Sequence, residues 1–147
     1  MTSEQKSSSE DRKHFDLCHD IIQVYYAVYN ELGFGFVEVV YEEALEIALR
    51  QAGFKVARQV DTPIWFRGKR IGKYKADLLV NDAVLLELKA ARNLEREHEA
   101  QVLNYLRATD IVVGLLLNFG PQPHFRRLVF ENNRKASRVH ARSPSTS

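Results

Sequence analysis

Apolar positions in the first third of the chain recur with the spacing of two amphipathic helices. Over residues 15–32 they return at intervals of three and four, which predicts a helix with one buried face. A Gly-Phe-Gly segment should end it, because glycine adopts the positive φ that closes a helix. A second helix is expected over residues 36–52, with Glu38, Tyr41 and Leu45 on its core-facing stripe. The solvent-facing side of that helix is expected to carry Glu42, Glu43, Glu46 and Arg50.

The rest of the chain alternates between strand-like and helix-like patterns. Five strands are predicted at apolar runs bounded by turn residues. They cover 54–66, with a break at Asp61-Thr62-Pro63, and 71–80, 83–88, 111–118 and 125–130. A third helix is expected over residues 94–108. The order α-α-β-β-β-α-β-β predicts an α/β domain with a mixed sheet flanked by helices.

The most apolar hairpin of the chain, residues 75–90, carries three charged side chains. Asp77 begins its first strand, and Glu87 and Lys89 lie in its second. Burying a carboxylate costs several kcal/mol unless a partner compensates it, so this hairpin requires an ion or an ion pair. Mg²⁺ suits such a place, because it binds one or two carboxylates and keeps sites for water and substrate phosphate.

The length of the hairpin loop decides whether these carboxylates meet. A two-residue loop would send Asp77 and Glu87 to opposite faces, because side chains alternate along a strand. A three-residue loop over residues 81–83 pairs Val80 with Val84 and sets Asp77 directly opposite Glu87, with Cβ atoms about 5 Å apart. We therefore predict the three-residue loop.

In that register Lys89 shares the face of the two carboxylates. A purely structural interpretation stays open at this point. Asp77 would then flank a turn, and Glu87 with Lys89 would form an ion pair on an edge strand that reaches water.

Composition indicates one globular domain. The chain has 147 residues, of which 45% are hydrophobic and 27% are charged, enough for one core and too few for two domains. Residues 1–12 and the basic residues 132–147 lack periodicity and are expected as disordered tails around a domain at 13–131. The net charge of +2 decides nothing about partners.

Cysteine content and hydropathy indicate the cellular compartment. The single cysteine, Cys18, excludes an internal disulfide and favours a reducing compartment. No apolar run reaches about 18 residues and the N-terminus is polar, so neither a membrane span nor a secretory signal is predicted. We expect a cytoplasmic protein.

Two sequence motifs together resemble a known nuclease family. The segment GFVEVVY at residues 35–41 is similar to the signature of the GxxExxY family. Asp77, the Glu87-Leu88-Lys89 run, and Gln101 with Tyr105 resemble the PD-(D/E)xK nuclease pattern to which that family belongs. Ala76 stands where the pattern expects proline. The resemblance implies a restriction-endonuclease-like fold and a metal-dependent nuclease.

The resemblance also implies residue roles. Asp77 and Glu87 would be metal ligands for Mg²⁺, with Mn²⁺ as a substitute, and Glu38 a further acidic residue in the same metal set. Lys89 would orient or activate the attacking water. Gln101 and Tyr105 would contact the substrate or its water, although a packing stripe on the sheet is an equal alternative. Tyr41 would support the site by packing on the hairpin and fixing a carboxylate.

Two functions follow as hypotheses. The first is a nuclease that hydrolyses phosphodiester bonds, with DNA favoured over RNA. The second is a non-catalytic nucleic-acid-binding or protein-interaction module that retains the fold. A basic and aromatic stretch over residues 65–75 is either a phosphate-contacting edge or a solvated hairpin. An exposed sheet edge would permit a homodimer.

Overall fold

The computed structural model describes the backbone of residues 2–135 and the side chains of residues 14–135. Three α-helices are α1 (Thr2–Leu32), α2 (Glu38–Gln51) and α3 (Arg96–Ala108). Five strands are β1 (Val56–Phe66), β2 (Lys69–Val80), β3 (Val84–Lys89), β4 (Val113–Phe119) and β5 (Pro123–Val129), and a short 3₁₀ helix follows at Asn132–Arg134. The predicted element order is confirmed.

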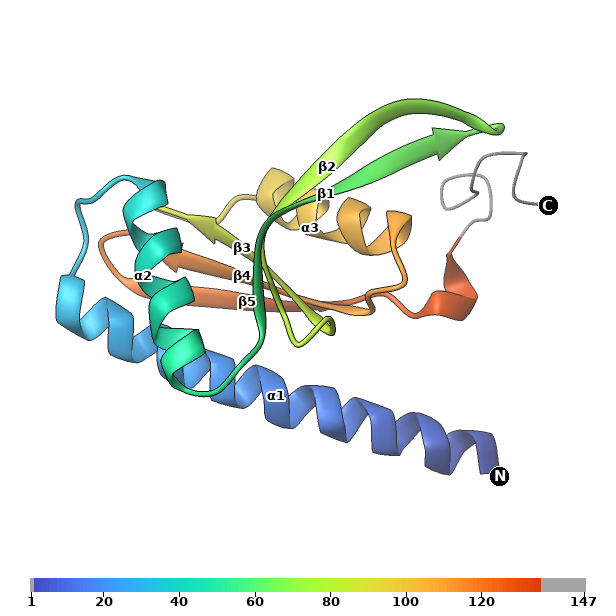
Figure 1. Ribbon diagram of the computed structural model, residues 1–147, viewed down its shortest axis with the longest axis horizontal. Helices are drawn as coiled ribbons and strands as arrows, with labels where there is room; N and C mark the ends of the chain where they lie inside the picture. The colour runs from blue at the N-terminus through green and yellow to red at the C-terminus, as the bar shows by residue number, and fades with distance from the viewer. Residues whose placement is uncertain (1, 136–147) are drawn as a thin grey trace.

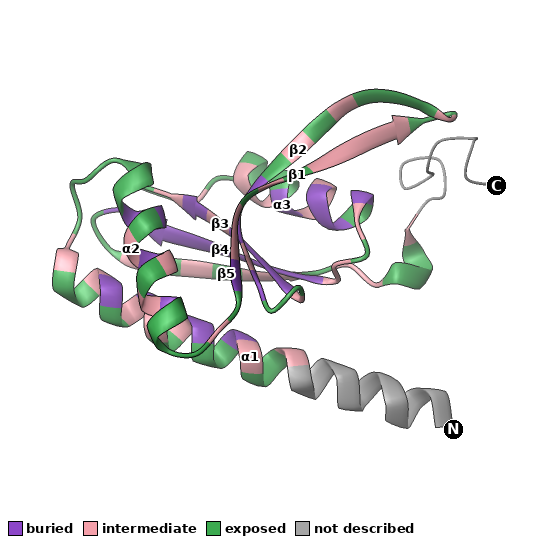
Figure 2. Cartoon of the chain, in the orientation of Figure 1, coloured by how far each residue is buried: buried purple, intermediate pink, exposed green. Residues whose placement is uncertain are grey.

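The strands form one mixed sheet in the order β1-β2-β3-β4-β5. Neighbours are antiparallel except β3 and β4, which are parallel and are joined through α3. Helices α1 and α2 cover one face, and α3 covers the other (Figure 1). Every residue of β4 is buried, and β4 and β3 form the buried centre of the molecule (Figure 2). This is the α/β architecture that the sequence predicted.

The hairpin between β2 and β3 has the predicted register. Val80 pairs with Val84 and Leu78 with Leu86, across the three-residue loop. Asn81 and Asp82 in that loop have positive φ, a conformation that these two residue types tolerate better than most. The apolar row Leu78, Val80, Val84, Leu86 and Leu88 packs entirely in the core beneath α1 and α2.

Strands β2 and β3 separate beyond the Leu78–Leu86 pair. From there β2 continues with β1 alone, whereas β3 stays with β4 as far as the pair Lys89–Asn118. We call this opening the fork. In the paired strand β1, Gln59 adopts a left-handed φ of 55°, a strained choice for a residue with a side chain.

Past the fork, β1 and β2 form a two-stranded arm that we define as residues 61–75, starting at the pair Asp61–Lys75. The arm extends away from the sheet beyond α3 (Figure 1). The sequence predicted a break at Asp61-Thr62-Pro63, but β1 is continuous there. Proline is tolerated because β1 is the edge strand, where one side needs no donor.

Both predicted tails are shorter than expected. Helix α1 begins at Thr2, where the sequence predicted an unstructured segment up to residue 12; this stretch has no glycine or proline to stop a helix. At the other end, Lys135 Nζ donates to the carbonyls of Thr109 (2.6 Å) and Ile111 (2.8 Å), so the structured part reaches Lys135. The remaining part of the predicted C-terminal tail, residues 136–147, lies outside the described residues.

Within the described part of the chain, no helix is long and apolar enough to cross a membrane. Cys18 is buried among core residues of α1, and burial raises the pKa of its thiol. A buried thiol agrees with a packing role for this residue.

Candidate active site

Asp77 and Glu87 face each other in the fork. The backbone N–H of Leu88 donates to Asp77 Oδ2 at 2.8 Å, and the N–H of Asp77 is 3.4 Å from Glu87 Oε1. These two N–H groups lie just past the last β2–β3 pair, where no opposing carbonyl is available. The carboxylates therefore accept the two backbone N–H groups that have no strand partner where β2 and β3 separate.

The two strands present their charged side chains in different ways. Glu87 alternates with Leu86 and Leu88, which lie in the core under α1 and α2, so Glu87 points to the α3 side. Strand β2 instead changes face at Asp77, because Ala76 packs with α3 whereas Leu78 packs with α1 and α2. Asp77 thus stands at the twist where the arm leaves the sheet.

Lys89 follows Glu87 by two residues on the same strand and shares its side of the sheet. At Glu87 and Lys89, strand β3 pairs with β4 alone, because the last β2–β3 pair is Leu78–Leu86. The side chain of Lys89 is partly exposed.

Both carboxylates are held in an environment that disfavours their charge. Burial raises the pKa of Glu87 to about 8, and the neighbouring charge of Asp77 adds to the effect. Burial also raises the pKa of Asp77 to about 6, with further contributions from Glu42 and Glu38 that outweigh the attraction of Lys89. Without a cation, the pair therefore holds protons at pH values where ordinary carboxyl groups have lost them.

Glu38 lies near this pair but stays at the surface. Its side chain is exposed, and Oε1 is 3.4 Å from the backbone N–H of Ala90, directly after β3. Its charge raises the pKa values of both Asp77 and Glu87. Among the described residues, however, no three His, Cys, Asp or Glu side chains are grouped closely enough to hold a metal ion. The compact carboxylate group is a pair.

Glu42 is buried, contrary to the prediction that it faces water. Its Oε1 is 3.1 Å from Arg58 Nε and also accepts a hydrogen bond from Gln59. One helical turn after Glu38, it reaches the sheet at the point where β1 has its left-handed residue. Among the charges acting on Asp77, that of Glu42 is the larger of the two from α2. No pattern in the sequence distinguished Glu42 from the exposed carboxylates of α2.

A cavity of about 200 Å³ opens beside Glu87 on the α3 side. Its lining comes from the arm, from β3 and from α3: Tyr74, Lys75, Glu87, Gln101 and Tyr105. The Tyr105 hydroxyl accepts a hydrogen bond from Thr62 Oγ1 at 2.9 Å, and burial raises its pKa. Gln101 and Tyr105, singled out together from the sequence, therefore meet Glu87 in one cavity.

Tyr41 has a structural role. Its hydroxyl donates to the carbonyl of Gly33 at 2.7 Å and is 3.2 Å from the N–H of Phe36, and its ring stacks on Phe119 with centroids 4.3 Å apart. It packs on β4 and closes the loop before α2, whereas the sequence predicted that its hydroxyl would fix a carboxylate. The loop that carries Glu38 is thereby held against the core.

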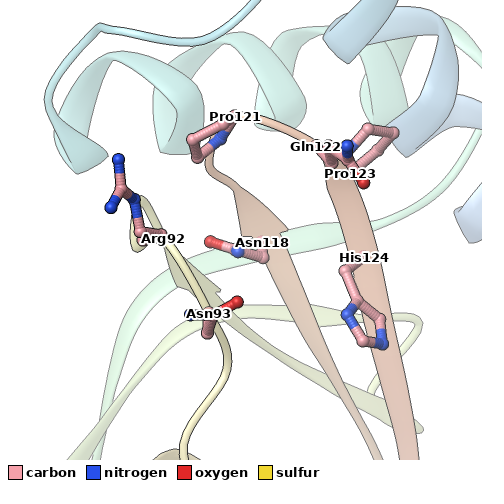
Figure 3. A pocket seen from close by; sticks show the side chains of 7 residues that line it. All are labelled: Arg92, Asn93, Asn118, Pro121, Gln122, Pro123 and His124. Atoms are coloured by element: carbon pink, nitrogen blue, oxygen red, sulfur yellow. The ribbon is translucent and has the colours of Figure 1, made fainter.

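A second cavity, of about 380 Å³, lies at the ends of β3 and β4. Figure 3 shows Asn118 between the loop that carries Arg92 and Asn93 and the strand that carries His124. Asn118 is buried, and both of its polar side-chain atoms bind the backbone of Ala91. Asn118 was not predicted as a functional residue, because in the sequence it is only the end of an apolar run.

The comparisons with known proteins agree with this fold. One solved structure that is similar is the crystal structure of SSO0001, with a TM-score of 0.52 and 21% identity over 63% of this chain and 50% of that one. The chain thus spans about half the length of that protein, and the likeness concerns the fold. No curated protein sequence matches the chain.

The fold is that of a restriction-endonuclease-like domain. The sequence matches the PD-(D/E)XK nuclease superfamily over residues 15–128, so the chain belongs to that superfamily. Members typically depend on a divalent metal, and the donor set here fits one: two adjacent carboxylates with uncompensated charge suit Mg²⁺, which takes its other ligands from water and phosphate.

Proposed function

We propose that this protein is a metal-dependent nuclease that hydrolyses phosphodiester bonds of nucleic acid, with DNA favoured over RNA. The observation that supports it is the opposed pair Asp77 and Glu87, half-buried in the fork with raised pKa values and Lys89 alongside. A structural ion pair would have a matched counter-charge, whereas this pair needs an added cation.

Asp77 and Glu87 would hold Mg²⁺, for which Mn²⁺ would substitute. Such an ion acts as a Lewis acid on the phosphoryl group of the substrate. Glu38 is exposed at the same opening and does not form a compact three-carboxylate group with the pair. It would therefore bind the metal ion through a water molecule. The proposed ligand set is therefore two direct carboxylates and one at longer range.

Lys89 would orient the attacking water and stabilise the charge that develops on the phosphoryl oxygens. Its ammonium is a mobile point charge with three donors, and it lies two residues from Glu87 on the same side of β3. Gln101 and Tyr105 would position the substrate from the cavity that they share with Glu87. The Tyr105 hydroxyl already accepts from Thr62, so its own proton is free to be donated to a phosphate oxygen.

The motif Gly35-x-x-Glu38-x-x-Tyr41 supports placement in the GxxExxY family. Tyr41 would act as a positioning residue that fixes the loop before Glu38. A cytoplasmic location and a homodimer remain proposals from the sequence.

A second candidate is a non-catalytic nucleic-acid-binding module. The observation that favours it is the exposed position of Glu38, which leaves only two carboxylates in the compact site. The two functions differ in metal-dependent turnover, not in nucleic-acid binding.

The test is cleavage of single-stranded, duplex and branched DNA, and of RNA, with Mg²⁺, with Mn²⁺ and with a chelator. We expect cleavage that requires metal and is lost in Asp77→Asn and Glu87→Gln. Asp82→Asn, an exposed change in the adjacent loop, is the matched control and should cleave normally. Binding without cleavage by the unaltered protein in every metal would establish the second candidate instead.

A further inference from the structure

The β1–β2 arm, residues 61–75, is one of two basic segments of the chain. It contains five basic residues and one acidic residue, a net charge of +4. Residues 132–147 carry another +4, so the other 116 residues sum to −6, and the whole chain carries +2. The basic side chains of the arm are Arg67, Lys69, Arg70, Lys73 and Lys75. A basic hairpin next to an acidic domain is suited to a polyanion.

The arm cations are almost unpaired. All five are exposed, and only Lys73 forms an ion pair, with Asp61 at 3.6 Å. Arg67 stacks on the Phe66 ring at 4.9 Å, which leaves its guanidinium donors available. Within the described part of the chain, Lys69, Arg70 and Lys75 form no ion pair or side-chain hydrogen bond, so the arm keeps its charge for a ligand.

The tip also exposes apolar side chains that have no core to enter. Ile71 is 65% exposed and Phe66 is 41% exposed. Both stand within five residues of the Arg67-Gly68 turn. Inside a nucleic-acid groove, these apolar side chains among the cations would contact base edges, such as thymine methyl groups.

The shape of the arm fits a groove of duplex DNA. From Lys75 to Lys69 the strand spans roughly 20 Å at about 3.3 Å per residue. This reach exceeds the depth of the B-DNA major groove, about 8.5 Å, and that groove is about 12 Å wide, enough for a two-stranded ribbon. The major groove of duplex RNA is too narrow for side chains to read.

A second copy of the chain is a weaker occupant for the arm. Pairing through the free edge of β1 would need a continuous row of backbone donors, and Pro63 in the middle of the arm lacks one. Five exposed cations would also repel the same five on a partner arm. Charge complementarity favours a polyanion.

The arm is continuous with the carboxylate site. Tyr74 and Lys75, at its base, line the same cavity as Glu87, and Asp77 follows two residues later. A duplex held by the arm would therefore pass directly over the fork.

We propose that the β1–β2 arm enters the major groove of duplex DNA and holds that duplex across Asp77 and Glu87. The inference rests on the proposed nuclease function and specifies its substrate as double-stranded DNA.

The experiment measures binding in the absence of cleavage. Asp77→Asn protein without metal is titrated by fluorescence anisotropy with a 20-bp DNA duplex, the RNA duplex of the same sequence, and the single DNA strand. The arm variant combines Arg67→Gln, Lys69→Gln and Arg70→Gln in that background. The control combines Lys55→Gln, Arg107→Gln and Arg134→Gln, which removes the same charge outside the arm.

We expect the DNA duplex to bind tightest. The arm variant should lose about tenfold or more in affinity and reduce the slope of log K against log salt by about 2 to 3, near 0.9 per lost phosphate contact. Ile71→Ser should lower affinity without changing that slope, because it removes an apolar contact alone. The charge control should bind as the parent does.

Equal DNA affinities of the arm variant and the charge control would overturn the proposal, as would RNA or single-strand binding as tight as that of duplex DNA. The same experiments test the nuclease function independently of the arm. Arm-dependent duplex binding by a protein that cleaves nothing would support the arm and reject catalysis, whereas arm-independent cleavage would reject the arm alone.

Discussion

Asn118 holds Ala91 by both of its side-chain polar atoms. Oδ1 accepts the Ala91 N–H at 3.0 Å, and Nδ2 donates to the Ala91 carbonyl at 2.8 Å. Asn118 also pairs with Lys89 in the parallel β3–β4 ladder, so it fixes the chain directly after Lys89. Gly120 permits this approach, because a Cβ there would stand 1.9 Å from the Ala91 carbonyl oxygen.

Replacing Asn118 with alanine should loosen the loop after β3. The change leaves the Ala91 N–H and carbonyl without these partners, and a buried unsatisfied polar group costs about 1–3 kcal/mol. We expect a lower free energy of unfolding in urea and faster hydrogen exchange over residues 90–95. Asn93→Ala, in the exposed part of the same loop, should change neither. Unchanged hydrogen exchange over residues 90–95 in Asn118→Ala would contradict the conclusion that Asn118 holds this loop.

Metal should stabilise the protein through Asp77. A cation that binds the folded state alone raises stability by about 2.7 kcal/mol at a hundredfold excess over Kd. Millimolar Mg²⁺ or Mn²⁺ should therefore raise the melting temperature, and Asp77→Asn should abolish this increment. The asparagine oxygen still accepts from the Leu88 N–H, so the metal-free variant should be as stable as the parent or more so, having lost a repulsive charge.

An equal metal increment in Asp77→Asn would argue against this carboxylate as a ligand. Asp82→Asn, which removes an exposed charge in the loop next to β2, should retain the full increment. Asp77 would instead be a structural carboxylate if Asp77→Asn lowers the melting temperature of the metal-free protein and metal does not raise the melting temperature of the parent.

Without metal, stability should fall as pH rises. The pKa of Glu87 is about 8 in the folded state against an ordinary 4.5, and that of Asp77 is about 6 against 3.8. Between these values the folded protein holds protons that the unfolded chain has lost, so the free energy of unfolding decreases with pH. The stabilisation is complete below about pH 4 and is lost through pH 8.

Glu87→Gln tests this pH dependence. Urea unfolding from pH 4 to 8 should show a flatter profile in the variant, which has no proton to lose at residue 87. Glu38→Gln, at an exposed carboxylate, should keep most of the slope of the parent. A parent slope of the opposite sign that Glu87→Gln does not change would refute the buried ionisable pair.

The Glu42–Arg58 pair should contribute to stability more than surface pairs do. Glu42 Oε1 is 3.1 Å from Arg58 Nε, with side-chain exposures of 8% and 29%. Removing one partner of a fully buried pair costs ~3–5 kcal/mol, and the partial exposure of Arg58 reduces our expectation for Glu42→Ala to about 2 kcal/mol. A double-mutant cycle with Arg58→Ala measures the coupling.

The pair Lys55–Asp82 is the matched surface control. Its side chains are 73% and 65% exposed at 2.7 Å, and exposed pairs contribute about 0–1 kcal/mol. Equal coupling energies in the two cycles would show that burial does not strengthen the Glu42 pair.

The hairpin could be predicted because one physical rule determines it. Side chains alternate along a strand, so only a three-residue loop sets Asp77 opposite Glu87 while keeping Leu78 and Leu86 on one apolar face. The grouping of Gln101 and Tyr105 with Glu87 could be predicted as well, through the resemblance of the motif, because a four-residue spacing puts both on one side of α3.

The roles of Glu38 and Glu42 could not be assigned correctly from periodicity. A helical stripe has no sharp edge, and the left-handed Gln59 brings Arg58 against α2, so Glu42 is buried while Glu38 stays exposed. That backbone distortion depends on tertiary packing and has no local signal, since Gln59 is not glycine or asparagine. The fork, which opens next to Gln59 in the sheet, was likewise absent from the prediction.

The fork makes the molecule modular. Beyond the Thr62–Tyr105 contact, the backbone hydrogen bonds of the arm run between its own two strands, while the carboxylates are fixed by β2, β3 and their shared ladder. The tip from Ile64 to Ile71 can therefore be lengthened, shortened or exchanged without moving Asp77 or Glu87. A different ribbon could therefore be grafted onto an unchanged carboxylate pair.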